Sequence, residues 1–193
     1  VIKVKAITTR KNPILQTLVG PGEEHVSLAG IPTEASIHIE CQDALPGLVQ
    51  NVYAHSSGGG KFLAILQVKK RNEGDDGMTR QAEIIAQAVY RELKNVILFD
   101  EDVDLFDTDD VLWAMQTRFS GDMDAIFVPG VAGHVLVDPS QSPLYDPWVC
   151  SKGTTTKTIF DCTVPYPLKE HFVRARFKDV DPSLWAPSLF GKG

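Results

Sequence analysis

Short apolar runs separated by polar turns recur along the chain and predict alternating strands and helices. Apolar residues rich in branched and aromatic types, which suit a pleated sheet, occur at 49–54, 61–68, 96–99, 125–128 and 157–162. Apolar residues at helical spacing occur at 33–44, 79–93 and 108–117. Thr33 can cap the first of these helices. The alternation predicts an α/β domain with a mixed, mostly parallel sheet flanked by helices.

The segment 96–118 combines a buried strand, an acidic turn and a helix. Five acids follow Phe99 within eight residues: Asp100, Glu101, Asp102, Asp104 and Asp107. Asp107 or Thr108 can cap the helix that follows. The acids should lie at the carboxyl end of a parallel strand, where open α/β sheets build sites. A divalent cation is one interpretation, but the spacing of a calcium loop is absent, so a solvated turn is the simpler one.

The two ends of the chain differ from this central pattern. The strand-like runs at 1–9 and 13–19 predict a hairpin, and a chain that starts in mid-strand without Met indicates a piece of a longer protein. We therefore expect one α/β domain over 1–178, whose first 19 residues continue from an upstream domain. Residues 179–193 are expected to form an extended tail that docks on another surface, such as a partner subunit.

Composition narrows the class of protein. The 193 residues are 43% hydrophobic, enough for one sizeable core, and carry a net charge of −6. The longest basic run is Lys69–Arg71, which does not indicate a nucleic-acid surface. No run is long enough to cross a bilayer, and no signal peptide is evident. Cys41, Cys150 and Cys162 are widely spaced and indicate reduced thiols in a cytoplasmic protein.

Three loop positions carry candidate chemistry. His25 follows Glu24 in a Gly-Pro loop and could act as an acid, a base or a hydrogen-bond donor. Lys61 follows three glycines and could hold a carboxylate or phenolate. His134 follows a predicted strand end. Each residue also has a plain interpretation, as a surface group or as a histidine bonded to the backbone.

Arg118, Asp124 and Asp161 lie near the ends of predicted elements. They could form an ion pair or, with backbone carbonyls, a site for a monovalent cation. No Ser-His-Asp order, nucleotide fingerprint or zinc spacing is present.

Several segments together resemble the UbiD family. They occur in the family's order at Ile7–Ile14, Gly22–Glu24, Val96–Asp104, Asp110–Arg118 and Lys157–Asp161. The resemblance spans residues 1 to about 165, and its most specific part is the acidic run followed by Asp110-Val-Leu-Trp-Ala-Met-Gln-Thr-Arg118.

The resemblance implies a reversible aromatic-acid decarboxylase that uses prenylated FMN, with Mn²⁺ and K⁺ bound mostly by an N-terminal domain. The family's catalytic Glu and Arg residues would lie upstream of Val1, so no catalytic residue is expected in this chain. It also implies a homodimer or larger homo-oligomer without nucleic acid or membrane, and a flavin prenyltransferase that supplies the cofactor.

Two sets of residues correspond to family sites. Arg118, Asp124, Asp161 and the carbonyl of Thr163 match a potassium site. The segments holding Glu24, His25, His134 and Leu136 match substrate-facing segments, and Lys61 is expected to join them.

Two histidines and a lysine in an otherwise apolar pocket indicate a substrate with phenolic hydroxyls. The expected reaction converts 4-hydroxybenzoate or 3,4-dihydroxybenzoate to phenol or catechol plus CO₂. The alternatives are a polyprenyl-hydroxybenzoate decarboxylase of quinone biosynthesis and, for this chain by itself, a non-catalytic oligomerisation module.

Overall fold

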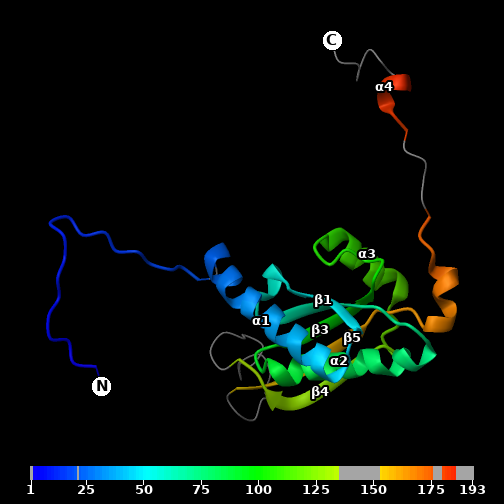
Figure 1. Ribbon diagram of the computed structural model, residues 1–193, viewed down its shortest axis with the longest axis horizontal. Coiled ribbons are helices and arrows are strands. Elements are labelled where there is room, and N and C mark those ends of the chain that lie inside the picture. The colour runs from blue at the N-terminus through cyan, green and yellow to red at the C-terminus, as the bar shows by residue number, and fades with distance from the viewer. Residues whose placement is uncertain (1, 21, 135–152, 176–179, 186–193) are drawn as a thin grey trace.

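A computed structural model describes residues 2–20, 22–134, 153–175 and 180–185 of the chain. Its described part contains a five-stranded sheet in the order β1-β2-β3-β5-β4 (Figure 1). The strands are β1 (Val49–Ala54), β2 (Leu63–Val68), β3 (Asn95–Asp100), β4 (Ala125–Ala132) and β5 (Thr154–Asp161). The α-helices are α1 (Glu23–Ala44), α2 (Asp76–Val89), α3 (Thr108–Arg118) and α4 (Pro182–Trp185). Short 3₁₀ helices cover Ser56–Gly58, Glu73–Asp75 and Tyr166–Phe172.

The sheet is mixed, which confirms the α/β prediction. β3 pairs in parallel with β2 on one side and with β5 on the other. The antiparallel pairs β1–β2 and β5–β4 form the two edges of the sheet. The carboxyl ends of the three parallel strands therefore meet at one edge, which carries the acidic turn after Asp100.

Alternating side chains of the central strands supply two cores, one on each face of the sheet. In the first core, Leu66 of β2 and Leu98 of β3 lie with Ile37 of α1 and Ala86 of α2. The second core, under α3, contains Ile65, Ile97, Phe99, Val111 and Ala114. Because successive side chains of β2 and β3 enter cores on opposite faces, most residues of these strands are apolar, which is the pattern of a fully buried strand.

α1 begins ten residues before the predicted start at Thr33. Gly30 and Pro32 lie inside the helix, and such residues usually indicate a break. The helix persists because packing against β1 outweighs these local preferences, with Gly30 buried close to Ala54. Thr33 is not the cap, since its Oγ1 donates to the carbonyl of Ala29 at 2.8 Å within the helix. Residues 23–25, predicted as a loop, are therefore its first turn.

The predicted hairpin over 1–19 is wrong for the part of the segment that the structure describes. Residues 2–19 form an exposed extended arm that leaves the domain (Figure 1). Ile2 is 93% exposed and Leu15 is 85% exposed. Alternation specifies which side chains share a face, but a two-stranded ribbon without a further packing surface is marginally stable at best.

Other predicted elements agree with the structure to within a few residues. β1 has the predicted bounds, and β5 begins three residues earlier than expected, at Thr154. Cys41 and Cys162 are free and buried, as the thiol prediction requires, while Cys150 lies outside the described residues. Within the described ranges, no helix is both long and apolar enough to cross a membrane.

The tail beyond residue 179 is described only in part. Residues 180–185 lie away from the sheet and contain the short helix α4 (Figure 1). Residues 186–193 lie outside the described residues. The division at residue 178 and the docking of the tail therefore stay predictions.

Candidate functional site

The acidic turn is ordered by hydrogen bonds within the chain. Asp107 caps α3, because its carboxylate accepts from the backbone N–H groups of Asp109 at 3.0 Å and Asp110 at 3.5 Å. Asp110 in turn accepts from the N–H of Asp104 at 2.8 Å. The predicted cap at Asp107 is confirmed, and acids in the first turn also suit the helix dipole.

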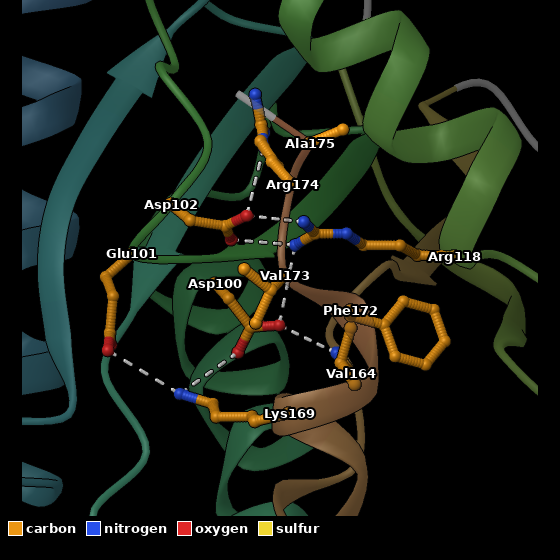
Figure 2. Close-up of a pocket in the computed structure, with 10 residues that line it drawn as sticks. All are labelled: Asp100, Glu101, Asp102, Arg118, Val164, Lys169, Phe172, Val173, Arg174 and Ala175. Atoms are coloured by element: carbon orange, nitrogen blue, oxygen red, sulfur yellow. Dashed lines mark hydrogen bonds and ion pairs between the residues drawn. The ribbon is translucent and has the colours of Figure 1, made fainter. Parts of the chain in front are cut away.

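Arg118 connects the far end of α3 to the acidic turn (Figure 2). Its Nη1 donates to Asp102 Oδ1 at 2.9 Å and its Nη2 to Asp102 Oδ2 at 2.5 Å, which is a bidentate pair. Nη1 also lies 3.7 Å from Asp100 Oδ2, and the Arg118 side chain is only 2% exposed. The expected ion pair of Arg118 with Asp124 or Asp161 is therefore wrong, because the guanidinium pairs with Asp102 and Asp100, whereas Asp124 and Asp161 both pair with Arg80.

A strap formed by residues 169–175 crosses the same edge of the sheet. Arg174 Nε lies 3.1 Å from Asp102 Oδ2, and its Nη1 lies 2.5 Å from Asp110 Oδ1. Lys169 Nζ lies 3.8 Å from Asp100 Oδ1 and 3.6 Å from Glu101 Oε1. The strap and the turn enclose a hollow of about 480 Å³, visible in Figure 2. The acidic side chains at this hollow are paired with basic ones, so we call the set a structural clamp. It consists of Asp100, Glu101, Asp102, Asp110, Arg118, Lys169 and Arg174.

Burial and ion pairing act differently on two neighbouring carboxylates. Burial raises the pKa of Asp100 above its usual value, and the opposing charges of Lys70, Lys169 and Arg118 do not offset it. At Asp102 burial acts in the same direction, but the hydrogen bonds and charges of Arg118 and Arg174 lower its pKa overall. The hydrogen bonds to both guanidinium groups make Asp102 the ionised centre of the clamp.

The predicted residues His25, Lys61 and His134 come together at another place. They line one cavity of about 80 Å³ with Val26, Gly58, Gly59 and Phe62. His25 and Lys61 also line a more open hollow of about 380 Å³ beside α1. His25 comes from the first turn of α1, Lys61 precedes β2, and His134 follows β4. Three segments far apart in sequence thus bring one lysine and two imidazoles to a single cavity.

The glycine turn before β2 holds this cavity against α1. Gly60 has a left-handed φ of 68°, and a Cβ added there would lie 2.6 Å from the carbonyl oxygen of Val26. Only a glycine allows the backbone turn to approach the helix this closely. The contact fixes the distance between the turn that carries Lys61 and the residue that follows His25.

Replacing Gly60 with Ala is expected to destabilise the domain more than replacing Gly59 with Ala. Both residues have a positive φ, but a Cβ at Gly59 meets nothing within 4 Å. The shared backbone strain costs about 1 kcal/mol in each variant, and the clash with α1 should cost a further 1–3 kcal/mol at Gly60 alone. Urea unfolding measures both; equal losses would contradict the proposed contact with α1.

A carboxylate that the sequence did not indicate lies between two of these residues. Glu92 Oε2 is 3.7 Å from Lys61 Nζ, and Glu92 Oε1 is 3.6 Å from His134 Nε2. The ring of His134 meets Phe62 edge-on, with the ring centroids 5.7 Å apart. Glu92 lies in the turn between α2 and β3, where no periodicity or motif singles it out.

The remaining predicted substrate residues lie elsewhere. Glu24 is exposed on the first turn of α1, and it does not line either cavity within the described part of the chain. Leu136 lies outside the described residues. A role for either side chain in substrate binding stays a prediction.

The predicted potassium residues are divided between two places. Asp161 accepts from Thr163 Oγ1 at 2.7 Å and from Arg80 Nε at 3.3 Å. Asp124 Oδ1 lies 3.5 Å from Nη2 of the same arginine, while the guanidinium of Arg118 belongs to the clamp. Arg80 thus occupies the position of a cation between the two aspartates, and potassium binding there stays a prediction. No group of three His, Cys, Asp or Glu side chains that could hold a metal ion occurs among the described residues.

Comparisons with known proteins agree with this fold. A family model described as the 3-octaprenyl-4-hydroxybenzoate carboxy-lyase C-terminal domain matches residues 26–162. The chain therefore belongs to the UbiD family and contains its C-terminal domain. A gallate decarboxylase from Lactiplantibacillus plantarum is 51% identical over 181 residues, which are 93% of this chain and 37% of that protein.

Solved structures place the chain in the same family. A 3,4-dihydroxybenzoic acid decarboxylase from Enterobacter cloacae aligns with a TM-score of 0.81 and 62% identity, over 92% of this chain and 36% of that one. The UbiD-class enzyme HmfF from Pelotomaculum thermopropionicum, solved with FMN, aligns with a TM-score of 0.74 and 29% identity, over 91% and 36%. The chain thus spans little more than a third of the length of these relatives.

Proposed function

We propose that this chain is the C-terminal domain of a decarboxylase that removes CO₂ from hydroxylated benzoates, with 3,4-dihydroxybenzoate as the preferred substrate. The convergence of His25, Lys61 and His134 on one cavity carries the proposal. The ammonium of Lys61 can donate to a phenolic oxygen, and each imidazole can donate or accept according to its protonation. The polyhydroxylated substrates named for two similar proteins support the same substrate class.

The proposed role of these residues is to bind and orient the ring. Loss of CO₂ from the carboxylate leaves an electron pair at the ring carbon, which must then take up one proton. Prenylated FMN, when bound, would supply the electron sink for this step. The cavity of about 80 Å³ suits the hydroxyl-bearing edge of a ring, so the carboxylate would lie outside it, toward the remainder of the protein.

The alternative functions predict different linings for this cavity. A polyprenyl substrate would need a long apolar channel, whereas three polar side chains line the cavity described here. A small phenolic acid is therefore the better match. Decarboxylation measured with and without the N-terminal part of the protein separates this proposal from a purely oligomerising role for the chain.

Replacing Lys61 with Met in a complete enzyme containing this chain should lower kcat/KM for 3,4-dihydroxybenzoate by about a hundredfold. The variant removes a charged donor from a site where a buried phenolic oxygen would be left without its partner. Lys69→Met is the matched control, because Lys69 is exposed and does not line either cavity of the described site. Catechol formation measures the effect; Lys61→Met turnover equal to that of the control would refute the proposal.

A further inference from the structure

The turn between α2 and β3 is held against the segment that carries Lys61. The N–H groups of Lys94 and Asn95 both donate to the carbonyl of Phe62, at 2.9 and 2.8 Å. Leu93 is fully buried in the first core and anchors the turn from the other side. The backbone position of Glu92 is thereby fixed next to the residue that follows Lys61.

The side chain of Glu92 is also held. Its Oε2 accepts from the hydroxyl of Tyr90 at 3.4 Å, and Tyr90 lines the open hollow beside α1. The Lys61, Glu92 and His134 side chains are 27%, 23% and 12% exposed, so all three are partly withdrawn from water. Charge interactions between partly buried groups are screened less than those on an open surface.

We propose that Glu92 is a positioning residue that sets the orientation of both Lys61 and His134 for hydroxyl recognition. Each carboxylate oxygen of Glu92 faces a different partner: Oε2 faces the ammonium group of Lys61, and Oε1 faces Nε2 of His134. A carboxylate favours hydrogen on the ring nitrogen that faces it, so it orients the imidazole and selects its protonated nitrogen. The edge-on contact with Phe62 restricts the same ring from another direction.

The carboxylate has a second consequence for Lys61. The lysine side chain is a flexible four-carbon chain, so its ammonium group can turn into the solvent unless a partner holds it. Glu92 holds it at the rim of the cavity and balances its charge while no substrate is bound. A substrate hydroxyl then meets a donor that is already in place, which reduces the entropy cost of binding. This inference rests on the proposed function, because it assigns Glu92 a role in the same site.

The test uses a complete enzyme with Glu92→Ala, Glu92→Gln and, as a matched control, Glu73→Ala. Glu73 is exposed in the 3₁₀ helix before α2 and does not line either cavity of the described site. Glu92→Ala should raise KM for 3,4-dihydroxybenzoate about tenfold while kcat changes less, since ground-state and transition-state binding are both weakened. Glu92→Gln should recover part of the loss, because its amide oxygen still accepts from one partner.

Calorimetric binding of 3,4-dihydroxybenzoate to the flavin-free enzyme should show the same order of affinity without any turnover. If Glu92→Ala binds as tightly as the control while Lys61→Met does not, the role of Glu92 is refuted and the proposed function stands. If neither variant weakens binding, both are refuted. A loss of thermal stability in Glu92→Ala that matches its loss of affinity, with no recovery in Glu92→Gln, would assign Glu92 a structural role and overturn the inference.

Discussion

Replacing Arg118 with Met is expected to lower the free energy of unfolding of the chain by about 3 kcal/mol, since it removes two charge-assisted hydrogen bonds to Asp102 and one of the cations beside the buried Asp100, while Arg174 still pairs with Asp102. Arg118 is the most buried cation of the clamp, with its side chain 2% exposed. The variant would remove both hydrogen bonds to Asp102 and the charge next to Asp100. It would also detach the end of α3 from the end of β3, although the methionine would refill part of the volume.

Arg71→Met provides the matched control for Arg118. Arg71 makes a similar two-point contact with Asp75, at 3.1 and 3.2 Å, but its side chain is 58% exposed. Asp75 is buried, with its side chain 8% exposed, but water reaches the guanidinium of Arg71 and screens the pair, so its loss should cost about 1 kcal/mol. Urea unfolding followed by circular dichroism gives both values. If the two variants lose the same stability, the clamp is not the buried structural element that the geometry indicates.

Replacing Glu83 with Gln is expected to stabilise the chain at neutral and alkaline pH. Glu83 lies in α2 between Thr79 and Gln87, which bond to β5 through Asp161 and the carbonyl of Thr158. Its side chain is fully buried, and neither carboxylate oxygen has a hydrogen-bond partner within the described residues. Burial, assisted by the charge of Asp161, raises the pKa of Glu83 from 4.5 to about 10.

The sign of the effect follows from proton binding. Between pH 4.5 and about 10 the folded chain keeps a proton that the unfolded chain has released, so stability falls as pH rises through this window. From pH 5 to pH 8 this one group accounts for about 4 kcal/mol. Gln has a similar shape but no proton to lose, and the variant should lack that share of the pH dependence.

The measurement is the free energy of unfolding at pH 5 and pH 8 for the wild type, Glu83→Gln and Glu73→Gln. Glu73 is exposed, so its variant should follow the wild type. The difference in the free energy of unfolding between Glu83→Gln and the wild type should be larger at pH 8 than at pH 5. A difference that is the same at both pH values would show that Glu83 is ionised in the folded chain.

The strands and helices that the sequence predicts best are those whose local pattern and tertiary role coincide. β3 is an apolar run that ends at a polar turn, and Asp107 is a capping residue followed by acids in the first helical turn. The sequence predicts only the second half of α1, because Gly30 and Pro32 are typical of a helix break, and packing against β1 overrides this preference. The hairpin prediction for residues 2–19 is wrong for the opposite reason, because an alternating pattern does not specify the neighbouring strand with which a strand must pair.

The site shows the same division between local pattern and spatial arrangement. His25, Lys61 and His134 can be predicted from the sequence, because ionisable side chains in loops, together with the family resemblance, indicate a pocket. Glu92 and the pairing of Arg118 with Asp102 depend on which turns and helix ends the sheet brings together. A preference for a helix or strand contains no information about these contacts, so sequence spacing could not indicate them.

The central claim is that Lys61 and its neighbouring imidazoles recognise phenolic hydroxyls. Its most direct test is the ratio of kcat/KM for 3,4-dihydroxybenzoate to that for 3,4-dimethoxybenzoate, compared between the Lys61→Met and Lys69→Met forms of a complete enzyme. We predict a large ratio in Lys69→Met that falls by about tenfold or more in Lys61→Met, because methylation removes the hydroxyl hydrogen and crowds the donor. The same ratio in both variants would contradict the account.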